Sequence, residues 1–256
     1  FELASNTMET LFSYEPGNRR IASFPIKGTC ERIGNETSDS PRAKQLLATP
    51  KERAEHVMIV DLVRNDLGRI CDPGSVQVPR LMGLEGYKGV WHGVSTIEGT
   101  LRPEMGLPDA IRSLFPGGSI TGAPKRRSIE LIEDIEKEPR GFYTGSIGLI
   151  TPDGYANVSI LIRTLIKDDN GWGINVGGGI VWDSIPEREI AETWEKVSVF
   201  QSALRPEKNE SINDRRKTGK IDESQTRDST GSNTAKGLMS KAASKLSRSA
   251  AGSTIS

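Results

Sequence analysis

Residues 50–67 read P-K-E-R-A-E-H-V-M-I-V-D-L-V-R-N-D-L. This stretch predicts a long helix, because proline suits the first helical position and apolar residues recur at helical spacing behind it. The recurring apolar residues are Ala54, Val57, Met58, Leu62 and Val63. Strand-like segments precede and follow this helix, so we expect it to cover a sheet.

The predicted helix carries two glutamates three residues apart, Glu52 and Glu55, and a second predicted helix at 186–204 repeats the spacing with Glu189 and Glu192. Residues three apart on a helix are neighbours, with Cβ atoms roughly 5–6 Å apart. If the two faces meet, four carboxylates converge, and only a cation makes such a cluster tolerable. A hard divalent ion with oxygen ligands, most simply Mg²⁺, would suit it.

A structural interpretation of the same glutamates stays open from the spacing alone. Glu52 would close a capping box that begins at Thr49, and Ser184 begins a similar pattern at the second helix. Glu192 could pair with Lys196 one turn further on.

The folded part alternates helices with strands that follow one another through favoured hairpin turns, such as Pro152-Asp-Gly and Asp168-Asp-Asn-Gly171. This order predicts an α+β fold, with antiparallel sheets and helices packed outside. The expected strands are 8–15, 20–27, 75–79, 89–98, 142–151, 155–166 and 173–182. The other expected helices are 107–115 and 123–137.

Composition sets limits on function. The 256 residues carry no net charge, so no overall field favours nucleic acid or an anionic membrane. No apolar run approaches the roughly 20 residues that span a bilayer. Cys30 and Cys71 form no C-x-x-C pattern, so we expect reduced thiols in a cytoplasmic protein.

The last stretch differs from the rest, since residues 207–256 contain no Phe, Trp or Tyr and are rich in serine and lysine. Such a segment buries too little apolar surface to offset its ordering entropy. We therefore expect one folded domain at 1–205 and a disordered tail at 206–256. Basic residues in that tail give only weak grounds for a nucleic-acid or partner contact.

The glycine-rich stretch Pro116-Gly-Gly-Ser-Ile-Thr-Gly-Ala-Pro124 leads into a predicted helix. Free backbone N–H groups at such a helix start can hold an anion. The Walker pattern fails, because Ala123 stands where its lysine belongs, so a carboxylate is a better candidate than a triphosphate. A glycine-rich connection with a satisfied cap is the alternative.

Other polar residues have uncertain roles when taken singly. Arg163 stands in an expected apolar strand, where alternation places it on the same face as Leu161. Its charge must therefore be paired or lie at a ligand. Lys27 ends a strand, His92 lies within one, and each has a structural and a catalytic interpretation. Tyr143 could be an ordinary strand aromatic. The three glycines 177–179 would weaken a strand unless something approaches the backbone closely.

Together, eight segments in this order resemble the chorismate-utilising enzyme family over about residues 20–204. The segments are P-I-K-G-T, E-R-A-E-H-V-M-I-V-D-L-V-R-N-D-L-G-R, V-W-H-G-V-S, F-P-G-G-S-I-T-G-A-P-K, G-F-Y-T-G-S-I-G, I-L-I-R-T, G-G-G-I-V and E-R-E-I-A-E-T. The likeness implies the C-terminal part of the chorismate-binding fold.

The resemblance implies roles for individual residues. The four glutamates Glu52, Glu55, Glu189 and Glu192 would hold Mg²⁺, which would clamp the ring carboxylate of chorismate. His92 would assist proton transfer at the leaving hydroxyl. The residues implied to bind substrate are Ser119, Lys125, Tyr143, Arg163 and the backbone at Gly178 and Gly179.

Within the family, P-I-K-G-T is similar to the aminodeoxychorismate synthases of the para-aminobenzoate and folate branch, whereas anthranilate synthases usually carry alanine at the position of Lys27. The resemblance then implies Lys27 as a covalent nucleophile on the chorismate ring, and a glutamine amidotransferase subunit as the source of ammonia. Anthranilate synthase component I is the nearest alternative. A non-catalytic remnant that only binds a partner is another.

The chain departs from the family pattern at two places, since Cys30-Glu31-Arg32 replaces the usual Arg-Pro-Arg and Ala4-Ser-Asn-Thr7 replaces A-S-P-E. It also lacks the family's large N-terminal portion and a start methionine, so we expect an N-terminally truncated fragment. The motifs therefore predict the activity of the parent protein and not that of the isolated fragment.

Overall fold

The computed structural model describes residues 1–32, 41, 50–87, 90–169 and 171–204. The chain forms two compact units. One contains residues 5–162, and the other joins Phe1–Ala4 to the chain from Arg163 onward. The tail expected at 206–256 lies outside the described residues, as does Thr49 of the expected capping box.

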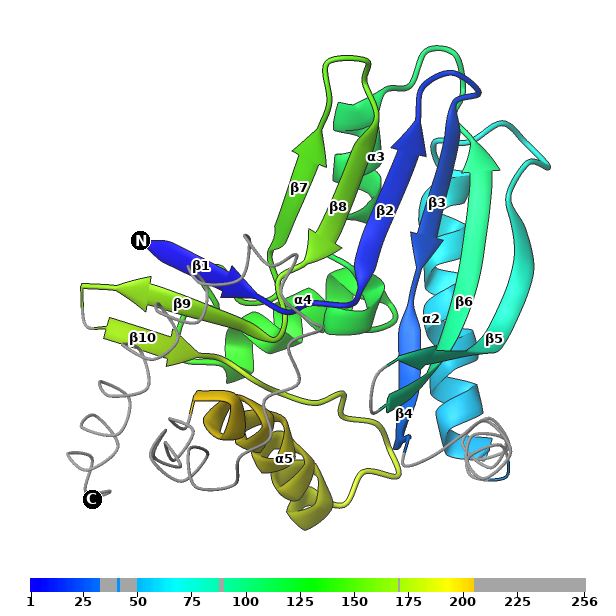
Figure 1. The fold of residues 1–256 in the computed structure, drawn as a ribbon. Coiled ribbons are helices and arrows are strands. Elements are labelled where there is room, and N and C mark those ends of the chain that lie inside the picture. Colours follow the sequence, from blue (N-terminus) through cyan, green and yellow to red (C-terminus); the bar gives the residue numbers. More distant parts are fainter. Residues whose placement is uncertain (33–40, 42–49, 88–89, 170, 205–256) are drawn as a thin grey trace, which may run out of the picture. The chain divides into compact units, whose positions relative to one another are not determined.

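The larger unit is built on a seven-stranded sheet in which every pairing is antiparallel (Figure 1). The strand order is β4-β6-β3-β2-β8-β7, and β5 pairs with β6 as well. The strands are β2 Thr10–Glu15, β3 Arg20–Phe24, β4 Ile26–Glu31, β5 Gln77–Tyr87, β6 Val90–Thr100, β7 Ser146–Ile150 and β8 Ala156–Ile160.

Two of these strands pair with β6 in succession. Ser23 of β3 lies opposite Ile97, and Ile26 of β4 lies opposite Val94, so the two strands continue one another across Pro25. Proline cannot donate to the ladder, which explains the interruption. The backbone N–H of Ser95 nevertheless donates to the Pro25 carbonyl at 3.2 Å. The expected strand at 20–27 is therefore found as two strands, and Lys27 belongs to the second.

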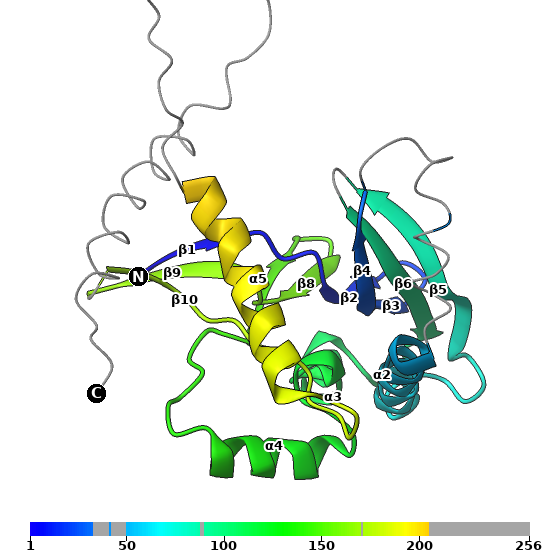
Figure 2. The same ribbon diagram turned by 90° about the horizontal axis from the view of Figure 1, so that it is seen from below.

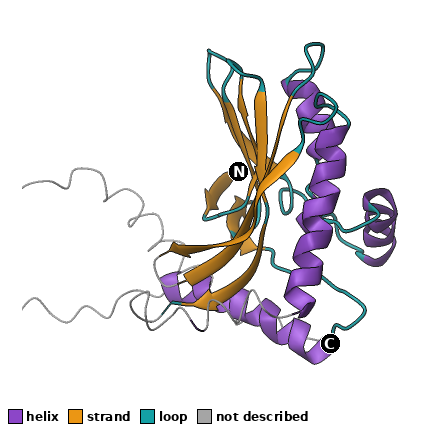
Figure 3. Ribbon diagram, turned by 90° about the vertical axis from the view of Figure 1, so that its right-hand side faces the viewer, coloured by secondary structure: helices purple, strands orange, loops and turns teal. Residues whose placement is uncertain are grey.

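Helices α2 Pro50–Gly68 and α3 Leu107–Leu114 pack together on one face of this sheet (Figure 2). The longer helix, α2, contacts β4, β5 and β6 and runs alongside the strands (Figure 3). A short 3₁₀ turn, η1 Gly118–Ile120, also contacts α2, and α4 Lys125–Ile135 follows it. The apolar core between sheet and helices includes Leu11, Phe12, Ile21, Val60, Val63, Leu67, Ile97, Leu114 and Ile160.

The buried face of α2 is not the one that the apolar spacing predicts. Ile59, Val60, Val63 and Leu67 are buried, whereas Ala54, Val57 and Met58 are exposed. The physical reason is that two polar residues, His56 and Asp66, belong to the buried stripe. The spacing of apolar residues therefore predicted a buried face that is rotated about the helix axis from the observed one.

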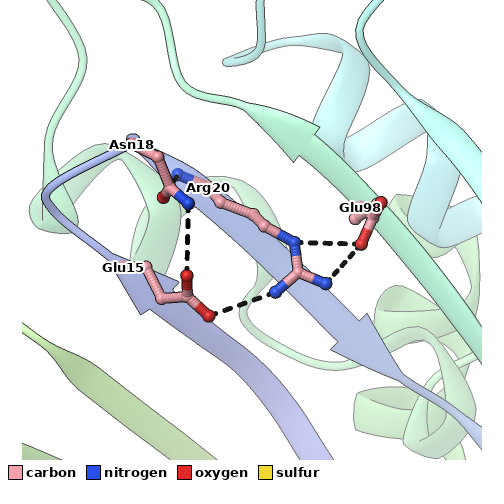
Figure 4. Close-up of polar contacts among 4 residues, drawn as sticks. All are labelled: Glu15, Asn18, Arg20 and Glu98. Atoms are coloured by element: carbon pink, nitrogen blue, oxygen red, sulfur yellow. Dashed lines mark hydrogen bonds and ion pairs between the residues drawn. The ribbon is translucent and has the colours of Figure 1, made fainter.

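The turn Glu15-Pro-Gly-Asn18 joins β2 to β3 and is braced by side chains (Figure 4). The Arg20 guanidinium donates to Glu98 of β6 at 3.0 Å through Nε and to Glu15 at 3.1 Å through Nη1. Asn18 accepts the Arg20 backbone N–H at 2.9 Å. All of these side chains are partly exposed, so the network fixes the turn more than it stabilises the chain.

The smaller unit contains a three-stranded sheet in the order β1-β9-β10 and a C-terminal helix. Its elements are β1 Glu2–Ser5, β9 Thr164–Asp168, β10 Gly171–Ile174 and α5 Pro186–Leu204. Buried Leu165 is its apolar centre, packed by Ala4, Trp172, Ile174 and Phe200.

Several expected strands have other boundaries. The strand expected at 155–166 is divided, because Arg163 adopts a left-handed backbone with φ of 50° between β8 and β9. The strand expected at 173–182 ends at Ile174, so the glycines 177–179 lie in a connection and not in a strand. The strand expected at 142–151 begins only at Ser146, and β5 is longer than the expected 75–79.

The expected capping box at Ser184 is also wrong. Its hydroxyl accepts the N–H of Val181 at 3.0 Å, while the first backbone bonds of α5 go to the carbonyl of Ile185.

The fold class is confirmed as α+β, with antiparallel sheets and helices packed against them. No helix within the described ranges is both long and apolar enough to cross a membrane.

We expect Leu67→Ala to lower the free energy of unfolding by about 2–5 kcal/mol, because it opens a cavity in the core between α2 and the sheet. Leu67 has no exposed surface, whereas Ile135 on α4 is 74% exposed. Ile135→Ala is the matched control and should change stability by roughly 0.5 kcal/mol or less. Urea unfolding followed by circular dichroism measures both, and equal losses would contradict the described packing.

Candidate active site

The larger unit brings Lys27 to the helix that carries the first glutamate pair. Lys27 lies on β4, and its Nζ is 3.9 Å from Oε2 of Glu55 on α2. Both side chains are mostly buried, with exposed fractions of 23% and 16%. An ammonium and a carboxylate that share a partly dry site attract each other more strongly than a surface pair. A lysine in such surroundings can serve as a nucleophile once its proton is removed.

The residue after Glu55 is a fully buried histidine, His56. Its Nε2 lies 2.5 Å from Oγ of Ser95 on β6, which is also fully buried. Burial, and after it the positive charge of Lys27, lowers the pKa of His56 from 6.5 to about 4. The ring is therefore neutral at physiological pH.

His92 lies on β6 in the same region of the sheet. Its backbone pairs with Thr29 of β4, and Gly93 beside it pairs with Lys27. The ring has no exposed surface and meets the Tyr87 ring edge-on, with centroids 5.4 Å apart. Lys27 and His92 thus come from adjacent strands, and the expected strand around His92 is confirmed as β6.

The glycine-rich stretch forms η1 and contacts both the sheet and α2. A Cβ on Gly117 would lie 2.8 Å from Ile160 Cδ1, and one on Gly118 would lie 2.7 Å from Leu62 Cδ2. A side chain at either position would therefore force the Ile160 or Leu62 side chain to move. Ser119 follows with its hydroxyl oxygen buried and without a hydrogen-bond partner among the described residues.

Lys125, at the start of α4, extends its ammonium to Asp66 of α2. The Nζ donates to Oδ2 at 2.6 Å and to the Leu114 carbonyl at 3.4 Å. Asp66 is nearly inaccessible, and burial raises the pKa of its carboxyl above the usual range, although Lys125 opposes that shift. The ion pair joins α4 and the end of α3 to the helix that carries Glu55.

Tyr143 lies in the turn before β7 and not in a strand. The Arg140 guanidinium is 5.9 Å from the centroid of its ring, and it also donates to the Ile120 carbonyl of η1 at 3.1 Å. Burial raises the pKa of the Tyr143 hydroxyl. Arg140 thus couples the Tyr143 turn to the Ser119 segment.

In the smaller unit, the expected strand position of Arg163 is wrong, because its left-handed backbone removes it from the alternation of faces. Its side chain is half-buried, and no ion pair to it is found among the described residues. A guanidinium in that state can bind a carboxylate through two parallel hydrogen bonds.

The second glutamate pair lies on α5 beside the glycine connection. A Cβ on Gly178 would lie 3.5 Å from Oε2 of Glu189. Lys196 donates to the Gly177 carbonyl at 2.8 Å and pairs with Glu192 at 2.9 Å, so the expected Glu192–Lys196 pair is confirmed. Gly178 and Gly179 are exposed. This unit therefore places the glycines and both glutamates together.

The chemistry of the four glutamates suits Mg²⁺, since all their donor atoms are carboxylate oxygens. The side chain of Glu52 lies outside the described residues, and the two pairs belong to different units. Among the described residues, no group of three or more His, Cys, Asp or Glu side chains is arranged to hold a metal. The magnesium site therefore stays a prediction.

Three residues of the larger unit's site carry no assigned role in the sequence reasoning: His56, Asp66 and Ser95. A signal for the first two exists, because His56 and Asp66 fall at helical spacing with the apolar residues Ile59, Val60 and Val63. A polar residue within an apolar stripe has to find a buried partner. Ser95 gives no comparable signal, since serine is common in strands with one wet face.

Comparison with known proteins places these residues in context. Residues 1–202 match the family described as chorismate binding enzyme. The chain is 47% identical over 180 residues to anthranilate synthase component 1 of Spirochaeta aurantia, covering 70% of this chain and 37% of that protein. It is 45% identical over 183 residues to aminodeoxychorismate synthase of Streptomyces pristinaespiralis, covering 72% and 26%.

The chain is also similar in fold to a solved structure from the same group of proteins. Anthranilate synthase component I from Streptococcus pneumoniae TIGR4 superposes with a TM-score of 0.68 at 38% identity, over 76% of this chain and 42% of that one. The chain thus spans less than half the length of each of these three proteins.

We expect the unfolding free energy to fall by on the order of 3 kcal/mol between about pH 6.5 and pH 4, because of His56. The folded-state pKa is about 4 and the ordinary value is 6.5, so the unfolded chain binds the extra proton in that window. Stability is thus full above the window and is lost as pH falls. Urea unfolding at several pH values measures this, and His56→Gln should show a flatter profile. Identical profiles would contradict a buried neutral ring.

We expect Lys125→Met to lower the unfolding free energy by about 3 kcal/mol, because it leaves the Asp66 carboxylate buried without its cation. Adding Asp66→Asn should recover part of the loss. The control is Arg126→Ala on the same helix, whose guanidinium is 94% exposed and 3.4 Å from Glu130. Exposed pairs contribute roughly 0–1 kcal/mol, so thermal unfolding should separate the variants clearly.

Proposed function

The chain belongs to the family of chorismate binding enzymes, and from that premise we propose that it is part of an enzyme that aminates chorismate to 4-amino-4-deoxychorismate. This is the reaction of an aminodeoxychorismate synthase component I, in the branch that leads to para-aminobenzoate and folate. One relative named aminodeoxychorismate synthase is 45% identical over the shared region.

The observation that carries this choice is the position of Lys27. Its amine lies on β4, mostly buried, 3.9 Å from the Glu55 carboxylate and on the strand next to His92. A reacting amine needs a nearby group that can accept its proton, and this position provides one. A lysine that does not react has no such need. Glu55 is the first candidate for that role.

In the proposed reaction, the neutral Lys27 amine forms a C–N bond to the chorismate ring while the ring C–O bond to the C4 hydroxyl breaks. The electron pair leaves with the hydroxyl, which takes a proton and departs as water, and His92 would supply or relay that proton. Ammonia then forms the C–N bond at C4 as the bond to Lys27 breaks, and the lysine returns to the amine.

The proposed substrate contacts use groups that suit carboxylates. Arg163 offers a half-buried guanidinium with no ion pair among the described residues, and the exposed glycine backbone at Gly178 and Gly179 can be approached closely. Tyr143 adds a hydroxyl for the enolpyruvyl group. The buried Ser119 hydroxyl offers a directed hydrogen bond. Lys125 would act on the same segment, with its ammonium held by Asp66.

We further propose Mg²⁺ as the cofactor, held by Glu52, Glu55, Glu189 and Glu192. When bound, the ion would neutralise the ring carboxylate and support departure of the hydroxyl. The fit rests on the donor chemistry of the carboxylates. Glu192 would have to exchange its contact with Lys196 for the metal, and Glu55 would share its charge between the metal and Lys27.

The proposed partners are chorismate and a glutamine amidotransferase subunit that supplies ammonia. The names of several relatives describe a component 1, which fits an enzyme built from more than one chain. Cys30 and Cys71 are free thiols, which fits the reducing cytoplasm where such an enzyme would work.

Anthranilate synthase component I is the second candidate, because most of the similar proteins carry that name, two of them at 47% and 48% identity. The two activities share the substrate and differ in the product. The full-length protein is incubated with chorismate, Mg²⁺ and ammonium salt. Chromatography and mass spectrometry of the products then distinguish the two activities. Retained 4-amino-4-deoxychorismate supports the proposal, and direct release of anthranilate and pyruvate overturns it.

We expect Lys27→Ala to abolish the covalent adduct with chorismate and to slow amination by about a hundredfold or more, the scale on which loss of a reacting group acts. Intact-protein mass spectrometry would show wild-type protein heavier by one chorismate less one water. The control is Lys137→Ala, which removes an exposed lysine. Unchanged amination in Lys27→Ala would remove the nucleophile from the proposal.

A further inference from the structure

His56 and Ser95 are the fully buried polar pair in the larger unit that the proposed chemistry does not use. They come from different elements, α2 and β6, and their 2.5 Å contact is short. An apolar residue at the position of His56 would continue the stripe of Ile59, Val60 and Val63 without burying a polar ring. A polar pair that replaces apolar packing in a core is weak evidence for a stability role.

The direction of the contact follows from a third group. The backbone N–H of Met82 donates to Ser95 Oγ at 2.9 Å. Met82 is buried, has a left-handed backbone with φ of 50°, and lies where the β5–β6 register shifts between Arg80 and Gly83. Its N–H is thus outside the regular ladder and is satisfied by the serine hydroxyl.

Because Ser95 Oγ already accepts from Met82, its own proton is free to donate, and His56 Nε2 is the acceptor within reach. This places the ring proton on Nδ1, which has no partner among the described residues. The reverse arrangement would leave both the serine proton and the second ring nitrogen unsatisfied. The two hydrogen bonds therefore run in one direction, from Met82 on β5 through Ser95 on β6 to His56 on α2.

This series of hydrogen bonds ends at His56, the residue next to Glu55. The Lys27–Glu55 distance of 3.9 Å is beyond hydrogen-bond length, so that contact cannot by itself fix how α2 is rotated. The apolar contacts of α2 are non-directional, and another short polar contact, from Lys125 to Asp66, lies near the far end of the helix. The His56–Ser95 bond is directional and short, and successive residues on a helix are about 100° apart, so fixing His56 fixes the direction of Glu55.

We propose that His56 is a positioning residue that, through Ser95, holds α2 in the rotation that turns the Glu55 carboxylate toward the Lys27 amine. The proposal deepens the proposed function, since it assigns what sets the geometry of its nucleophile. It concerns the uncomplexed chain, so it can be tested without chorismate.

The test measures how fast the Lys27 amine reacts with acetic anhydride at fixed pH, resolved by peptide mass spectrometry. Lys137 in the same molecule is the internal reference, because it is exposed. Glu55→Gln removes the carboxylate that faces the Lys27 ammonium at 3.9 Å. We expect Lys27 to react about two- to fivefold faster in this variant, the scale of a partly screened ion pair. No increase in Glu55→Gln would overturn the proposal.

Ser95→Ala and His56→Leu should each reproduce the increase seen in Glu55→Gln. Neither should add to it when combined with Glu55→Gln, because all act through the same carboxylate. His56→Gln places an amide where Nε2 was and should stay within about twofold of wild type. Full additivity with Glu55→Gln, or an equal rise at Lys137, would show general loosening and overturn the positioning role.

Failure of the proposed function and failure of the positioning role would give different results. If the chain does not convert chorismate but the acylation pattern holds, His56 positions Glu55 and the assigned reaction is wrong. If chorismate is aminated and the variants leave Lys27 reactivity unchanged, the reaction stands and the positioning role falls. Two independent variants, Ser95→Ala and His56→Leu, guard against a single one that does not fold.

Discussion

The packing of α2 against the seven-stranded sheet is the constraint on which the rest of the larger unit depends. This helix carries Glu55, presents four buried apolar residues to the core, and receives η1 through the close approach of Gly118 to Leu62. It is also anchored by two directional polar contacts, His56 to Ser95 near its start and Asp66 to Lys125 near its end. Apolar burial holds the helix on the sheet, and the polar contacts define its rotation.

Both anchors illustrate how a core accommodates polar groups. The His56 ring is buried neutral, so its desolvation cost is that of a dipole and not of a charge. Asp66 keeps a cation 2.6 Å away, and the pair retains some access to solvent through Lys125. Each therefore has a partner, which is the usual condition for a polar side chain in a core.

The same contacts connect segments that are distant in the chain. The Asp66 carboxylate and the Leu114 carbonyl both accept from the Lys125 ammonium, and Arg140 links the Tyr143 turn to the Ile120 carbonyl. The glycine-rich segment is therefore held from several sides, and the Ser119 hydroxyl within it is buried. An irregular segment braced in this way can position functional groups, as loops on a rigid scaffold commonly do.

The sequence by itself determined the α+β class, the extents of α2, α3 and α5, the hairpin at Asp168–Gly171 and the family, because these rest on local propensity, turn chemistry and colinear motifs. Only the tertiary structure decided that α2 buries His56 and Asp66, that Arg163 leaves the strand, and which groups surround Lys27. The reason is physical: periodicity registers apolar side chains, whereas a buried polar residue is specified by a partner from another element, such as Ser95, that no local pattern contains.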